Sequence, residues 1–136
     1  MNDSKQLYYE LSFYTLAHTA PSFIHQHIVD AFTAQTADEN TKPISLIFSL
    51  AGLYLYLEKG FTGRQVQKFH LQMAKDKREW PTIVLPANRG TIDVSHVLAA
   101  APGPGRDSMI YQWCASVWGA YKANRDAILA LLKADL

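Results

Sequence analysis

The longest nearly uncharged stretch of the chain, residues 43–57, constrains the fold most strongly. It follows a polar segment at residues 38–42, and Gly60 just after it is a natural helix stop. The stretch is too short to cross a bilayer, and it contains Ser45 and Ser49. We therefore predict that it forms a buried helix at the centre of a helical bundle.

Helical periodicity and chain-breaking residues divide the remainder into further helices. No segment shows the alternation typical of a β-strand. Pro81 and Pro86 exclude a regular helix at residues 80–89. This segment also carries apolar side chains, which predict a loop packed onto the bundle. The predicted fold is all-α: an antiparallel bundle of four to five long helices, plus one short helix and a packed loop containing Pro and Trp. The predicted helices are 4–18, 22–37, 43–60, 63–78, 93–100 and 107–132, with Ser4 and Thr62 as caps.

Bulk properties limit the class of protein. With 136 residues, the chain fits a single domain, 1–136. Charged residues make up 18%, below the usual share of about 25%, so we expect apolar surface to serve a homo-oligomer. A formal net charge of +1 argues against nucleic-acid binding. The chain has a single cysteine, Cys114, and its N-terminus shows no secretory signal, which together predict a cytoplasmic location and no membrane partner. The identity of any small-molecule ligand stays open.

The run FIHQHIVDAF, residues 23–32, places polar side chains inside an apolar helical pattern. At about 100° per residue, His27 and Asp30 share a face with Ala31 and Ala34, and His25 lies on the other side. Buried histidine and aspartate are costly unless they are paired or bound. The run therefore predicts an interior polar cluster, and which of His25 and His27 faces that cluster stays open.

The other long helices before residue 78 also turn an acid, a histidine or both toward the predicted interior. On the first helix Glu10, Tyr14 and His18 recur at intervals of four. On the third and fourth helices the acid and the histidine lie beside apolar core positions. The predicted cluster contains His27, Asp30, Glu58, His70, Glu10 and His18, with Tyr14 and Gln67 next to it.

Carboxylates and imidazoles from facing helices are the usual ligands of metal sites in helical bundles. Nitrogen and oxygen donors without a thiolate suit one divalent transition metal, such as Zn, Mn, Fe or Ni. With open coordination positions, the metal would activate water or polarise a carbonyl, with Glu58 or Glu10 as base. The alternative is a hydrogen-bonded network in the core that neither binds a metal nor catalyses a reaction. The absence of the Glu-x-x-His and His-Glu-x-x-His spacings favours this alternative.

A second candidate feature is the turn at residues 60–64, which leads into a helix N-terminus that could hold an anion with help from Arg64. It lacks the ending of a P-loop. The alternative is a tight turn capped by Thr62, with Arg64 neutralising Glu58. Cys114 is predicted to be a small buried apolar residue, and His96 to be solvated or to cap its helix.

Several runs spread over nearly the whole chain together form a distinctive pattern. They are residues 10–16, FIHQHIVDA (23–31) with Gln35, GLYL (52–55) with Glu58, GRQVQ (63–67) with His70, Trp80-Pro81, Pro86, Trp113 and Val117-Trp118. In this pattern the chain resembles a bacterial family of small helical proteins of unknown function. The resemblance implies a single domain and no particular activity.

The predicted architecture is also similar to helical-bundle metalloproteins built around three histidines, such as the DinB-like thiol-dependent transferases and hydrolases. His18, His27 and His70 would be the corresponding residues, but their spacing matches no motif of that group, so no role is carried over. The leading hypothesis is a bundle protein with an interior His/carboxylate site for a divalent metal, performing hydrolysis or transfer if it is an enzyme. The rivals are an oligomerising or partner-binding module whose polar cluster is structural, and an anion binder using Arg64.

Overall fold

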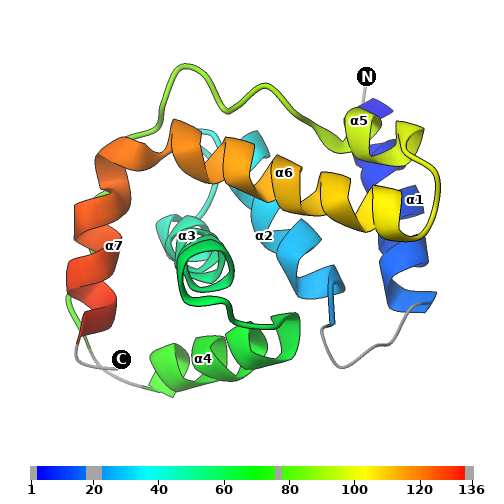
Figure 1. Cartoon of the computed structure of the whole chain (residues 1–136). Helices are drawn as coiled ribbons and strands as arrows, with labels where there is room; N and C mark the ends of the chain where they lie inside the picture. Colours follow the sequence, from blue (N-terminus) through cyan, green and yellow to red (C-terminus); the bar gives the residue numbers. More distant parts are fainter. Residues whose placement is uncertain (1–2, 18–22, 76–77, 134–136) are drawn as a thin grey trace.

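The computed structural model describes residues 3–17, 23–75 and 78–133, and in these ranges it contains helices and no strand. The predicted all-α bundle is confirmed (Figure 1). The helices are α1 (Asp3–Ala17), α2 (His25–Thr36), α3 (Pro43–Lys59), α4 (Gly63–Lys75), α5 (Val94–Ala99), α6 (Pro104–Ala120) and α7 (Arg125–Leu132), with a 3-10 turn at Lys122–Asn124.

Helix α3 lies at the centre of the molecule. In Figure 1 it is seen along its axis, with α2, α4, α6 and α7 around it. Its side chains from Ser49 to Leu55 are all buried, and Leu46 and Ile47 are buried one turn earlier. A helix surrounded on every side cannot carry charges without partners, which explains the uncharged sequence and confirms the predicted central helix.

Local signals set the ends of α3 and α4. Gly60 ends α3 in the left-handed conformation (φ 71°), which glycine adopts without strain. Thr62 then caps α4: its hydroxyl oxygen accepts from the Gln65 N–H at 3.2 Å, and its own N–H donates to Gln65 Oε1 at 2.8 Å. The predicted cap at Thr62 is confirmed, whereas Ser4 lies within α1 and does not begin it.

The predicted helix 107–132 is wrong as one element, because the chain bends after Ala120. Tyr121 and Asn124 hold the bend. The Tyr121 hydroxyl donates to the Ala34 carbonyl at 2.6 Å. The buried amide of Asn124 accepts from the Val84 N–H at 2.7 Å and donates to the Val84 carbonyl at 2.9 Å.

The segment between α4 and α5 is packed down, as predicted. In addition to the contact with Asn124, the segment is held by Gln35 of α2, which donates to the Ile92 carbonyl at 2.8 Å. The Gln35 side-chain oxygen accepts from Trp113 Nε1 of α6 at 2.9 Å, so one amide joins the loop to two helices.

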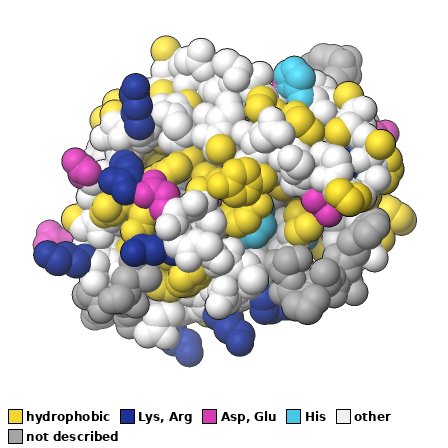
Figure 2. All heavy atoms as spheres, viewed as in Figure 1, with side chains coloured by type: hydrophobic (Ala, Val, Ile, Leu, Met, Phe, Trp, Pro, Cys, Tyr) yellow, Lys and Arg dark blue, Asp and Glu magenta, His cyan; other side chains and the backbone are white. Residues whose placement is uncertain are grey.

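Charged side chains gather at the edges of the face shown in Figure 2, over α4 and on the side of α7, while hydrophobic side chains lie across its middle. No helix in the described ranges is both long enough and apolar enough to cross a membrane.

Candidate functional site

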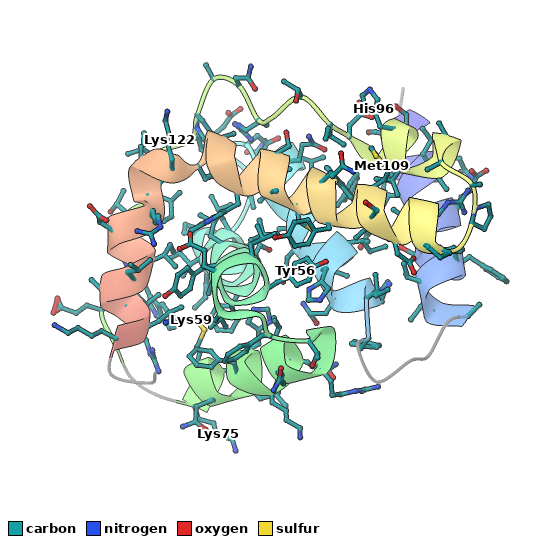
Figure 3. All side chains as sticks on the ribbon, viewed as in Figure 1. Tyr56, Lys59, Lys75, His96, Met109 and Lys122 are labelled. Atoms are coloured by element: carbon teal, nitrogen blue, oxygen red, sulfur yellow. The ribbon has the colours of Figure 1, made fainter. Side chains whose placement is uncertain are left out.

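Helix α2 turns His27 and Asp30 into the interior, and each is 2% exposed. The predicted burial of both residues is confirmed. The His27 ring stacks on Tyr56 of α3, with ring centroids 3.5 Å apart; Figure 3 shows Tyr56 between α3 and α2. Burial lowers the pKa of His27 to about 4, so the ring is neutral at pH 7.

His25 faces α1 instead. Its Nδ1 lies 2.9 Å from the hydroxyl oxygen of Thr15, which donates its own hydrogen to the Ser12 carbonyl. The Thr15 oxygen therefore accepts from His25 Nδ1–H. This arrangement answers the question left open by the sequence: His27, not His25, points between α2 and α3.

The Asp30 carboxyl group is held by few partners. Its Oδ1 accepts from Gln26 Nε2 at 3.1 Å, and its buried Oδ2 accepts no hydrogen bond from any described residue. A Cβ on Gly52 of α3 would lie 2.0 Å from Oδ2, so glycine makes room for the carboxyl group. Burial raises the pKa of Asp30 well above its usual range, and Asp30 therefore holds a proton more readily than a surface aspartate.

His70 of α4 is half-buried, and its tautomer follows from its contact with α3. Its Nε2 lies 2.8 Å from the Phe48 carbonyl oxygen, which can only accept. Nε2 therefore carries a hydrogen, and in the neutral ring Nδ1 is an acceptor. Burial lowers the pKa of His70, which favours this neutral form.

Asp30 and His70 line the same pocket between α2, α3 and α4, with a volume of about 370 Å³. We call it the Asp30–His70 pocket. It combines a carboxyl group with a raised pKa, a neutral imidazole, one amide and three hydroxyl groups, so it can donate and accept hydrogen bonds and exchange a proton. The other lining residues are polar Gln26, Thr33, Ser45 and Ser49 and apolar Val29, Ile44 and Phe48.

Glu58 and Glu10 do not join this site, and the prediction that they face the interior is wrong. Glu58 lies on the exposed last turn of α3, where its Oε2 accepts from Arg125 Nε at 2.9 Å and Trp118 Nε1 at 2.8 Å. The Arg125 guanidinium lowers the pKa of Glu58. Glu10 is exposed on α1. His18 lies outside the described residues.

The remaining predicted residues also lie elsewhere. The Tyr14 hydroxyl donates to Asp107 Oδ1 at 3.0 Å and accepts from the Gly103 N–H at 2.9 Å, which joins α1 to the start of α6. Arg64 lies over the Phe23 ring, 4.4 Å from its centroid, and donates to Gln67 Oε1 at 3.3 Å. Arg64 therefore does not neutralise Glu58, whose partner is Arg125.

The predicted convergence on one metal is not reproduced by the described residues. Among them, no three His, Cys, Asp or Glu side chains are grouped so as to hold a metal ion. Two further predictions are confirmed: Cys114 is fully buried, and His96 caps α5, its Nδ1 accepting from the Asp93 N–H at 3.1 Å.

Sequence reasoning missed two residues that shape the site. Gln26 stands four residues before Asp30, a spacing at which helical side chains meet. Gly52 interrupts an otherwise bulky apolar helix, which is a signal of close approach by another group. Both signals are present in the sequence, but neither says which helix supplies the neighbour.

The fold and the pocket define a small all-α bundle protein with a polar pocket between three helices. The chain belongs to a family of unknown function, DUF5946, whose model matches residues 5–122. No curated protein and no solved structure matches it.

Proposed function

We propose that the chain binds a small polar molecule in the Asp30–His70 pocket. The observation that supports this most strongly is the Asp30 carboxyl group, 2% exposed at a pocket and with Oδ2 lacking a hydrogen bond from any described residue. Buried polar atoms are nearly always hydrogen-bonded, and leaving one unsatisfied costs about 1–3 kcal/mol. A bound molecule that satisfies the carboxyl group would recover part of this free energy.

The other polar groups support a ligand with both donors and acceptors. His70 Nδ1 can accept, and the hydroxyl groups of Thr33, Ser45 and Ser49 can do either. The volume of about 370 Å³ lies within the range of small-molecule sites, near its lower end. The proposed ligand is therefore small and forms several hydrogen bonds.

The test is an NMR titration of the full chain with small amines, amides, alcohols and carboxylic acids. Binding should shift the amide signals of residues that line the pocket. Thr33→Phe narrows the pocket and should abolish these shifts. Thr36→Phe, on the exposed side of the same helix, should leave them unchanged. The proposal fails if no compound shifts the pocket signals, or if Thr33→Phe has no effect on the shifts.

A divalent metal in the same pocket is the second candidate. It is favoured by His70, because metal-bound histidines commonly donate their other ring N–H to a backbone carbonyl, as Nε2 does to Phe48. Asp30 and His70 would supply the two protein ligands, and metal-assisted hydrolysis or transfer would be the reaction to assay.

Calorimetric titration of the full chain with Zn²⁺ and Mn²⁺ tests this candidate. Asp30→Asn and His70→Gln should each weaken binding at least tenfold. Glu58→Gln is the matched control, since Glu58 is bonded to Arg125 away from the pocket. Equal weakening by all three variants, or no binding near one equivalent, would reject the metal.

A further inference from the structure

We propose that the ligand of the Asp30–His70 pocket is a small organic cation, a primary ammonium or an amidinium on a short apolar chain. This inference rests on the proposed function and adds the chemical class of the ligand. It follows from the charges and contacts around the Asp30 carboxyl group.

The pocket contains a carboxyl group and no fixed positive charge. None of the described residues that line it is Lys or Arg, and Asp30 is the single carboxylic acid among them. The side chain hydrogen-bonded to Asp30 is the neutral amide of Gln26. An anionic ligand would therefore meet no positive charge, and ionised Asp30 would repel it.

The titratable groups packed around Asp30 provide no compensating charge either. Burial is the main cause of the raised pKa values of the Tyr8 hydroxyl and the Cys114 thiol, the nearby Asp30 charge adds to both, and both groups are neutral at pH 7. Burial holds the neighbouring imidazoles, His27 and His70, in their neutral forms. A charged ligand nitrogen would supply both the missing positive charge and hydrogen-bond donors, and such charge-assisted bonds are about twice as strong as neutral ones.

The rest of the pocket fits a short alkyl or aryl group on that nitrogen. Val29, Ile44 and Phe48 supply apolar surface in the same pocket, and Ser45 and Ser49 supply hydroxyl acceptors. A neutral amide or alcohol of the same shape would bond to the hydroxyl groups but would leave the carboxyl group without a countercharge. Charge, more than shape, should therefore separate good ligands from poor ones.

Three probes of nearly equal size test the charge requirement: isobutylamine, isobutyramide and isobutyrate. Each is titrated into the full chain at pH 7 and 0.15 M NaCl, with chelator present, and followed by NMR. The amine should bind at least tenfold more tightly than the amide, and isobutyrate should give no saturable shift. Asp30→Asn should reduce the amine to the affinity of the amide. Asp126→Asn, which removes an exposed carboxylate on α7, should change nothing.

A pH series on the unaltered chain gives a second measurement that does not depend on the folding of Asp30→Asn. The amine keeps its charge between pH 5 and 8, so any change of its affinity in this range comes from the protein. Because the proposed contact requires ionised Asp30, binding of the amine should weaken as the pH falls. Binding of the amide should show no such loss. Equal affinities of amine and amide, or a pH-independent amine affinity, would overturn the inference while leaving the proposed function standing. Failure of all three probes to shift the pocket signals would count against both.

Discussion

Gly52→Ala is the sharpest test of the contact between α2 and α3. In an ordinary helix interior, alanine is more favourable than glycine by about 0.8–1.0 kcal/mol. Here the new Cβ would lie 2.0 Å from Asp30 Oδ2 and 2.8 Å from Asp30 Cγ, so the carboxyl group has to move inside a packed interior. Overpacking of this kind costs about 1–3 kcal/mol. We therefore expect Gly52→Ala to lower the free energy of unfolding by up to about 2 kcal/mol.

The contact is isolated by a double-mutant cycle with Asp30→Ala. Without the carboxyl group, the remaining close neighbour is Val66 Cγ1 at 3.1 Å, which needs only a small shift. Gly52→Ala should then be neutral or stabilising, which gives a coupling free energy of about 1–3 kcal/mol between the two positions.

Urea unfolding followed by circular dichroism measures all four members of the cycle. Gly119→Ala on α6 is the control, because no described residue beyond its own stretch of helix has an atom within 4 Å of the Cβ position, and it should stabilise the chain by up to about 1 kcal/mol. If Gly52→Ala has the same effect with and without Asp30, within about 0.5 kcal/mol, the carboxyl group does not rest on Gly52 and the structure of the site is wrong.

Three further predictions concern stability. Because the pKa of His27 is lowered to about 4 in the folded chain, its contribution to the free energy of unfolding is fully present above pH 6.5. This contribution, about 3 kcal/mol, is lost as the pH falls toward 4. His27→Gln should remove this part of the pH profile of stability, and an unchanged profile would contradict the buried ring. Asn124→Ala should lower the free energy of unfolding by about 1–3 kcal/mol and speed hydrogen exchange at Val84. Asn40→Ala, on an exposed loop, should change it by less than about 0.5 kcal/mol. Equal effects of the two substitutions would show that Asn124 does not hold the loop at Val84. Because the pKa of Glu58 is lowered, its contribution to the free energy of unfolding is present above about pH 4.5 and is lost on acidification. Glu58→Gln should therefore make the stability of the chain less sensitive to acid below about pH 4.5. The same substitution should leave the neutral-pH affinity of the pocket unchanged.

Burial of the predicted site residues was found correctly on α2 but not at the last turn of α3. His27 is the third residue of α2 and Asp30 the sixth, and both have apolar neighbours on several sides, so almost any packing of that helix buries them. Glu58 lies one residue before the end of α3, where the same helical face leaves the core. Periodicity gives the angle of a side chain around its helix, but not whether another helix covers that turn.

The sequence by itself determined the all-α class, the central uncharged helix, the turn from Gly60 to Thr62 and the burial of His27 and Asp30. These features depend on periodicity, caps and composition within one segment, and local physics decides them. Tertiary structure alone decided that His70 faces the same pocket as Asp30, that Glu58 pairs with Arg125, and that the last helix bends at Tyr121. Each of these depends on partners far apart in the chain, whose meeting is set by how whole helices pack against one another.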